Sequence, residues 1–147
     1  MKRLASILAA TMLLAPQAQA GPLCTELGFA GLLAKCNRGE PIVVTLASGQ
    51  PLSAGDVTLQ SGAYYEMQIT ADGTAELAIE GAAFFRAIWM NEIVISDIEV
   101  RPMAIDSLEF DAAGTATLSF IAIKPGSYEV RIPGTSGASQ RMTIAIQ

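Results

Sequence analysis

Histidine is absent from this chain of 147 residues, and residues that carry enzyme chemistry are scarce. Without imidazole, no Ser-His-Asp or Cys-His arrangement and no histidine metal ligand can form. Only two cysteines are present, and carboxylates such as Asp97, Asp106 and Glu109 are scattered with no nucleophile or base pattern around them. We therefore predict that the chain is not an enzyme.

Positive charge is also scarce, because nine lysines and arginines face fourteen aspartates and glutamates, which gives a net charge of −5. Nucleic acids and anionic membrane surfaces attract proteins through cationic faces, so this balance argues against both as general partners. Charged residues interrupt every apolar run beyond the first twenty residues. We therefore expect no membrane span in the chain that remains after signal cleavage.

The first twenty residues have the pattern of a secretory signal peptide. Lys2 and Arg3 form a basic start, residues 4–15 are an apolar run too short to span a bilayer, and residues 18–20 (Ala-Gln-Ala) match a cleavage site. We predict cleavage after residue 20 and a periplasmic or secreted protein, with an uncleaved anchor as the alternative. The predicted segments are a signal peptide at 1–20, a disulfide-closed segment at 21–40 and a β-sandwich at 41–147.

Cys24 and Cys36 are the two cysteines, and an even number in an exported chain predicts a disulfide. Two free thiols are the alternative; a metal pair is weaker, because two thiolates do not complete a closed site. Residues 26–34 are the helical candidate after the signal peptide. A continuous helix would hold the cysteines about 18 Å apart, whereas a disulfide needs Cα atoms about 5.5 Å apart. We therefore predict a short N-terminal helix after which the chain doubles back.

From residue 41 onward, apolar and polar residues alternate with the period of two that is typical of strands. Turn signals at residues 72–73 (Asp-Gly) and 125–126 (Pro-Gly) separate short strands, and we expect the first of them to close a hairpin. We also expect a bulge near residues 96–97 that keeps the isoleucines on both sides of it in the core. The pattern predicts an all-β fold, an antiparallel Greek-key β-sandwich.

Three segments of the C-terminal half resemble strands of the cupredoxin family. They are residues 107–110 (SLEF), 114–120 (GTATLSF) and 124–130 (KPGSYEV). In that family, a strand of the Pro-Gly-x-Tyr type leads into the copper-binding loop. The resemblance implies a cupredoxin-like sandwich.

The resemblance does not extend to the type 1 copper ligands, which are one cysteine, two histidines and usually a weak axial methionine. Ile132, four residues after Tyr128, stands where the family has its cysteine, and the loop that follows contains no histidine. Only Met142 stands near the position of the axial ligand. We therefore expect the fold without a blue-copper centre, and we predict no cofactor.

Residues 83–92 (AFFRAIWMNE) hold the only tryptophan and two of the five phenylalanines. We predict that Arg86 and Trp89 form a patch for a periplasmic protein partner or a small anionic ligand, because a guanidinium binds carboxylates and phosphates. Residues three apart on a strand face opposite sides, so the patch requires a bend between them. The alternative is that Trp89 fills the core and Arg86 pairs with a carboxylate. The candidate carboxylates are Glu92, Asp97 and Glu99.

Thioethers bind Cu(I), and four methionines follow the signal peptide. They are Met67, Met90, Met103 and Met142. They are widely dispersed, and the first and last have the spacing of core residues, so core filling is the primary interpretation. The sequence thus predicts a non-enzymatic exported binding or interaction domain. The alternative is a periplasmic copper-binding or copper-carrier protein with methionine ligands and copper as its cofactor.

Overall fold

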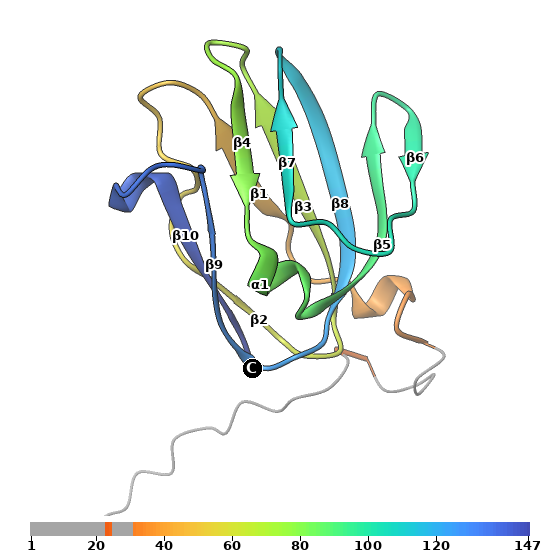
Figure 1. The fold of residues 1–147 in the computed structure, drawn as a ribbon. Coiled ribbons are helices and arrows are strands. Elements are labelled where there is room, and N and C mark those ends of the chain that lie inside the picture. The colour runs from red at the N-terminus through yellow and green to blue at the C-terminus, as the bar shows by residue number, and fades with distance from the viewer. Residues whose placement is uncertain (1–22, 25–30) are drawn as a thin grey trace, which may run out of the picture.

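Alternating apolar residues give most strands one face that must be buried, and two five-stranded β-sheets pack around the resulting core in the computed structural model (Figure 1). The structure describes residues 23–24 and 31–147. Sheet A has the strand order β1-β3-β8-β5-β6, and sheet B has the order β2-β10-β9-β4-β7. The predicted all-β sandwich is confirmed. Within the described residues, no helix has the length and apolar character needed to cross a membrane.

The bounds of the strands follow the alternating segments of the sequence. Sheet A contains β1 (Ile42–Leu46), β3 (Tyr64–Ala71), β8 (Gly114–Ala122), β5 (Ile88–Ile95) and β6 (Ile98–Val100). Sheet B contains β2 (Val57–Leu59), β10 (Arg141–Ile146), β9 (Gly126–Arg131), β4 (Leu77–Glu80) and β7 (Ser107–Phe110). One helical turn, α1 (Ala82–Phe85), connects β4 to β5, and it was not predicted.

Each sheet contains one parallel pair of strands, so the sheets are mixed and not wholly antiparallel as predicted. β1 runs parallel to β3, and β2 runs parallel to β10. Parallel neighbours cannot be joined by a tight turn. β1 and β3 become parallel because β2, which lies between them in the sequence, belongs to the opposite sheet.

The turn at Asp72 and Gly73 does not close a hairpin, because β3 before it lies in sheet A and β4 after it lies in sheet B. Gly73 has the positive φ of 75° that its turn position requires. The Asp72 carboxylate accepts hydrogen bonds from the N–H and the hydroxyl of Thr74, at 2.9 and 2.6 Å. The hydroxyl oxygen of Thr74 accepts a bond from the N–H of Ser48, which ties the turn to the end of β1.

Ser96 and Asp97 form the two-residue loop of a hairpin between β5 and β6, with φ values of 47° and 69°. The predicted bulge at this point is therefore wrong, and the observed irregularity lies at residues 90–92. Because the chain reverses direction, Ile98 lies opposite Ile95 on the edge strand and is 64% exposed. The expectation that Ile98 joins the core is therefore wrong.

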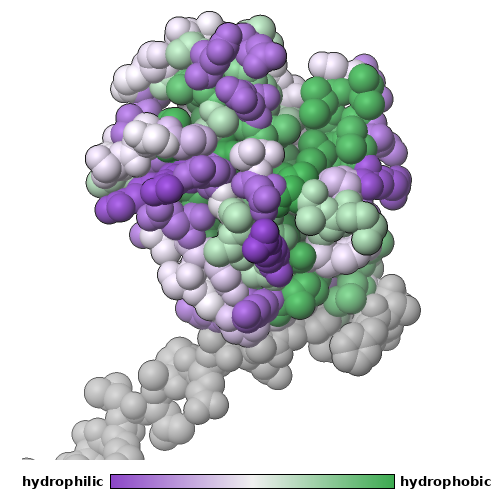
Figure 2. Space-filling view, viewed as in Figure 1, coloured by the Kyte–Doolittle hydropathy of each residue, from purple (hydrophilic) through white to green (hydrophobic). Residues whose placement is uncertain are grey.

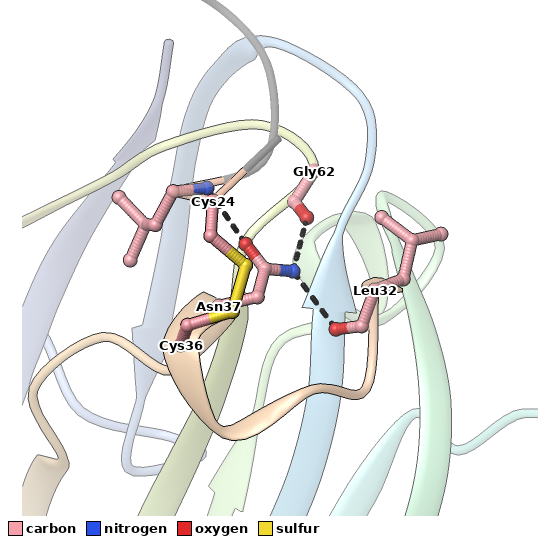
Figure 3. The surroundings of a disulfide bond; sticks show 6 residues. Cys24, Leu32, Cys36, Asn37 and Gly62 are labelled. Carbon is pink, nitrogen blue, oxygen red and sulfur yellow. Dashed lines mark hydrogen bonds between the residues drawn. A yellow bond between two sulfur atoms is a disulfide. The ribbon is translucent and has the colours of Figure 1, made fainter. Parts of the chain in front are cut away.

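A disulfide joins Cys24 to Cys36, with their Cα atoms 5.7 Å apart, and this prediction is confirmed (Figure 3). Most of the helix predicted over residues 26–34 lies outside the described residues. Its last residues, 31–34, form turns, and a single 3₁₀ turn, η2 (Lys35–Asn37), follows them. A disulfide is typical of chains that fold in an oxidising compartment, which agrees with the predicted export. Cleavage after residue 20 stays a prediction.

Asn37 is the polar anchor of the segment that contains the disulfide, and it is completely buried. Its side-chain oxygen accepts a hydrogen bond from the N–H of Leu23 at 2.7 Å (Figure 3). Its side-chain amide donates to the carbonyl oxygens of Leu32 and Gly62, at 2.8 and 2.9 Å. One side chain therefore holds both ends of the disulfide-closed loop and fastens them to the turn before β3.

The chain that follows Asn37 runs beside β3 and leads into β1, with Arg38 in a parallel bridge to Tyr64. The side chain of Tyr64 lies on the outer face of sheet A, which is the face turned away from the core. The N–H of Gly39 donates to the carbonyl oxygen of Tyr64, and the guanidinium of Arg38 stacks over the ring of Tyr64, 4.6 Å from its centroid. A Cβ at Gly39 would overlap the ring of Tyr65. Tyr64 and its cross-strand neighbour Ile121 are both buried although they point outward.

We expect Asn37→Ala to lower the free energy of unfolding by roughly 1–3 kcal/mol, because it leaves buried backbone groups without a partner. Urea unfolding monitored by circular dichroism measures the change. Asn91→Ala is the matched control, since the Asn91 amide is half-buried and donates to the Ser119 hydroxyl. An equal or larger loss in the control would show that Asn37 has no special anchoring role.

The Thr74 hydroxyl, followed by the Thr74 backbone N–H, holds the pKa of Asp72 below its ordinary value of 3.8. The stabilisation is therefore present above that ordinary value and is lost as the pH falls through the lowered pKa. We expect Thr74→Val to raise the pKa of Asp72 towards its ordinary value in an NMR titration of the carboxyl carbon. Thr58→Val, at an exposed position of β2, is the control. An unchanged Asp72 titration in Thr74→Val would contradict this assignment.

Candidate functional site

Apolar side chains occupy the position where the cupredoxin resemblance would place copper ligands. Ile132 directly follows β9 and is 8% exposed, and Met142 in β10 is 1% exposed. Leu52, from the connection between β1 and β2, is fully buried, and all three residues belong to the hydrophobic core. An isoleucine that packs with the core therefore stands where the resemblance places the copper-binding cysteine.

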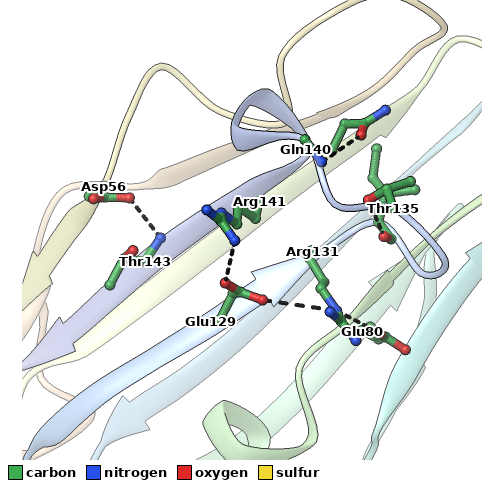
Figure 4. Close-up of polar contacts among 10 residues, drawn as sticks. Asp56, Glu80, Glu129, Arg131, Thr135, Gln140, Arg141 and Thr143 are labelled. Carbon is green, nitrogen blue, oxygen red and sulfur yellow. Dashed lines mark hydrogen bonds and ion pairs between the residues drawn. The ribbon is translucent and has the colours of Figure 1, made fainter.

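The loop over residues 133–140 is closed by hydrogen bonds within itself and to its neighbours. The N–H of Ile132 donates to the carbonyl oxygen of Gln140, and the N–H of Leu52 donates to that of Ser139, at 2.9 and 2.7 Å. The hydroxyl of Thr135 donates to the carbonyl oxygen of Ile132 (Figure 4). Across residues 23–24 and 31–147, no group of three or more His, Cys, Asp or Glu residues could hold a metal ion.

The helical turn α1 supplies the bend that a patch of Arg86 and Trp89 requires. Arg86 ends this turn with helical φ and ψ of −86° and −8°, and the N–H of Ala87 donates to the carbonyl oxygen of Phe84. Trp89 already lies in β5, opposite Ile121 of β8. The backbone thus changes from helical to extended between the two predicted site residues, so simple strand alternation does not govern their directions.

Arg86 lies at the surface, where its guanidinium is 3.6 Å from the carboxylate of Asp106. The alternative pairing with Glu92, Asp97 or Glu99 is wrong, because Arg86 pairs with Asp106, while Glu92 and Glu99 pair with Arg101. The side chains of Arg86 and Asp106 are 72% and 68% exposed. So exposed an ion pair contributes little to stability, and a competing anion can exchange with Asp106 at little cost.

Trp89 is 49% exposed on the outer face of sheet A, so the alternative that it fills the core is wrong. Ile123, two residues beyond its cross-strand neighbour, is also 49% exposed. The core position is taken by Phe84, which is fully buried and meets Phe120 edge-on with ring centroids 5.5 Å apart. Asp106, the partner of Arg86, precedes β7 of sheet B, whereas Trp89 projects from sheet A. Their shared surface therefore stays a prediction.

A surface cavity of about 600 Å³ adjoins Asp106, and sequence reasoning did not find it. Its walls come from the end of β4, the start of α1, β9 and residues 106–107. In its wall, Nε of Arg131 donates to the carboxylate of Glu80 at 2.7 Å, and Glu129 lies 3.7 Å from the guanidinium of Arg141 (Figure 4). Three carboxylates and one arginine line the cavity, so its wall is net acidic. The pairing of β4 with β9, which creates the contact of Glu80 with Arg131, left no signal in the sequence.

The four methionines lie at different depths. Met67 and Met142 are buried in sheets A and B, Met90 in β5 is half-buried, and Met103 in the connection from β6 to β7 is fully exposed. A thioether site for Cu(I) needs several sulfur atoms within reach of one ion. Copper binding by these residues stays a prediction.

Two packed sheets with this strand arrangement form a cupredoxin-like domain, as solved structures show. A blue copper oxidase from Nitrosomonas europaea matches 75% of this chain with a TM-score of 0.57 and 10% identity. A multicopper oxidase from Pseudomonas thermotolerans matches 74% with a TM-score of 0.55 and 13% identity. A copper nitrite reductase from Nitrosomonas europaea matches 80% with a TM-score of 0.55 and 13% identity. No family model and no curated protein matches the sequence.

The matched regions make up 44%, 30% and 52% of these three structures, so this chain spans about half of their length or less. At such identities the likeness shows the fold alone. It nevertheless contradicts the prediction that the chain is not an enzyme, since the structures with this fold are named as oxidases and a reductase. The lack of catalytic motifs in the sequence is therefore not enough to conclude that the chain is not an enzyme.

We expect stoichiometric Cu(II) to produce no intense blue absorption with this protein, because a type 1 centre needs a thiolate and imidazoles. Both cysteines are in the disulfide, and the chain has no histidine. Titration with Cu(II), followed by visible absorption, measures the outcome. Met142→Leu should give the same spectrum as the wild type. A strong blue band in the wild type would contradict the assignment, and a change of that band in Met142→Leu would point to Met142 as a ligand.

Proposed function

We propose that this chain is an exported cupredoxin-like domain that binds a partner through the surface carrying Arg86 and Trp89. The partner is a periplasmic protein with an acidic segment or a small anionic ligand. The half-exposed Trp89 is the observation that carries this proposal. It lies on the outer face of sheet A, in a fold whose other large aromatic side chains near it are buried.

The position of Trp89 supports a recognition role. An exposed tryptophan offers a large, rigid contact area and is enriched at binding hot spots. Ile123, just beyond the end of β8, is also half-exposed, and its N–H donates to the carbonyl oxygen of Ala87 beside the start of β5. A partner that covers Trp89 and Ile123 would remove apolar surface from water.

Arg86 supports an anionic or acidic partner. Its guanidinium is largely exposed and contacts Asp106 over 3.6 Å, which is longer than a good charge-assisted hydrogen bond. A carboxylate or phosphate of the partner could form a closer, two-pronged contact with the same group. The chain carries a net charge of −5, so an anion would be attracted locally at Arg86 against a repulsive background.

The copper-carrier alternative depends on methionine thioethers that a Cu(I) ion can reach. Met103 is fully exposed, whereas Met67 and Met142 are buried in different sheets. The structure offers no observation that favours this alternative over partner binding. Anaerobic titration with Cu(I), with Met103→Leu as the variant, distinguishes the two functions.

We expect Arg86→Ala to weaken the response of Trp89 fluorescence to a glutamate-rich peptide or to inorganic phosphate. A charge-assisted contact contributes roughly 1.5–3 kcal/mol, so affinity should fall by about tenfold or more. Thermal unfolding should be nearly unchanged, because the ion pair with Asp106 is exposed.

Arg141→Ala is the matched control, because Arg141 is a half-exposed arginine on β10 that also pairs with a carboxylate. It should leave the fluorescence response intact. If Arg86→Ala instead lowers the melting temperature and leaves ligand binding unchanged, Arg86 has a structural role and the proposed site is wrong.

A further inference from the structure

Strand β6 is an edge of sheet A that has β5 as its neighbour and nothing on its other side among the described strands. All three of its residues, Ile98, Glu99 and Val100, are exposed. An edge strand presents unpaired backbone N–H and C=O groups, which can pair with another strand. The side chains of β6 and the directions of its backbone groups determine which strand can pair with it.

One side of β6 is apolar. Val100 lies opposite Ile93, and Ile93 lies opposite the fully buried Leu118, so Val100 is on the core side of sheet A. Ile98 is on the same side, opposite Ile95. They are nevertheless 42% and 64% exposed. Figure 2 shows hydrophobic side chains gathered where β5 and β6 lie in Figure 1.

The other side of β6 carries charges of both signs. Arg101, which follows β6, lies 3.3 Å from Glu99 and 3.2 Å from Glu92 of β5. Glu99 and Arg101 alternate with the apolar residues and therefore share the outer face of sheet A. Along the chain the order is acidic, apolar, basic. When two copies of this segment run antiparallel, each acidic residue can therefore lie opposite a basic one.

The hairpin fixes which backbone groups face outward. In a two-residue hairpin, the residues that flank the loop exchange hydrogen bonds, and bonded pairs then alternate along the strands. Ile98 and Val100 therefore direct their backbone groups to β5, whereas those of Glu99 and Arg101 point away from it. Pro102, which has no N–H, falls in the same series as Ile98 and Val100, so it does not block the outer edge.

We propose that β6 pairs antiparallel with β6 of a second copy of this chain, about a two-fold axis at Val100. Glu99 would then lie opposite Arg101 of the second copy, and the reverse pair would form by symmetry. Both pairs have outward-facing backbone groups, so they would exchange hydrogen bonds across the edge. The two Val100 side chains would meet on the apolar side, and sheet A would continue from one copy into the other.

Other registers of the same pairing are disfavoured. A two-fold axis at Glu99 places Glu99 opposite Glu99 of the second copy, and like charges directly opposite are destabilising. A shift by one residue pairs an outward-facing backbone group with an inward-facing one, and it sets the apolar side of one copy against the charged side of the other. Charge and backbone direction thus select one occupant and one register.

The edge is short, so the dimer should be weak, with a dissociation constant in the micromolar range. Sedimentation velocity of the exported protein over a range of concentrations should show a monomer–dimer equilibrium. Glu99→Arg places like charges opposite each other in both symmetric pairs and should weaken the dimer by about tenfold or more. Arg101→Glu should do the same.

The charge-reversal pair provides the decisive comparison. An equimolar mixture of the two single variants should form a heterodimer, because Arg at position 99 of one copy then faces Glu at position 101 of the other. Glu109→Arg, on the exposed edge strand β7, is the control and should leave the dimer unchanged. Hydrogen exchange at the amides of Glu99 and Arg101 should slow as concentration rises.

A wild-type protein that remains monomeric at the highest soluble concentration would overturn the proposal. So would a dimer that Glu99→Arg leaves intact, or one in which exchange slows elsewhere and not at β6. Because Arg86 and Trp89 take no part in this pairing, the outcome does not depend on the proposed ligand site.

Discussion

The rest of the structure depends on the burial of β8 on both of its faces. β8 lies between β3 and β5 and pairs with both along nearly its whole length. Leu118 and Phe120 enter the core between the sheets, while Ser119 and Ile121 point outward and are also buried. A strand buried on both faces cannot shift its register without exposing apolar side chains, so it fixes the strands on either side.

The same constraint creates the candidate site. On the outer face of sheet A, the guanidinium of Arg38, in the segment that Asn37 anchors, stacks over Tyr64 of β3. Trp89 lies opposite Ile121 on this face, yet half of its side chain remains in water. On this face a partner could therefore reach Trp89 but not the buried Tyr64 and Ile121.

The likeness to copper enzymes is a likeness of fold. At the position where the resemblance places the copper ligands, Ile132, Met142 and Leu52 fill the core, and hydrogen bonds close the loop over residues 133–140. The sandwich can therefore keep its shape there without a metal. Function lies in the residues that a fold displays, and different surfaces of one fold can be used independently. Here the exposed Trp89 and the exposed edge β6 lie on different strands of sheet A, so a ligand and a second copy need not compete.

Composition and local alternation determined much of this protein: the strand segments, the disulfide partners and the lack of imidazole ligands follow from the sequence alone. Tertiary structure decided which sheet each strand enters, as the turn at Asp72 shows by joining two sheets where a hairpin was expected. It also decided the partner of Arg86, which is Asp106, and the exposure of Trp89. The physical reason is that alternation specifies which side chains share a face of a strand, whereas the neighbours of that face come from contacts between segments far apart in the chain.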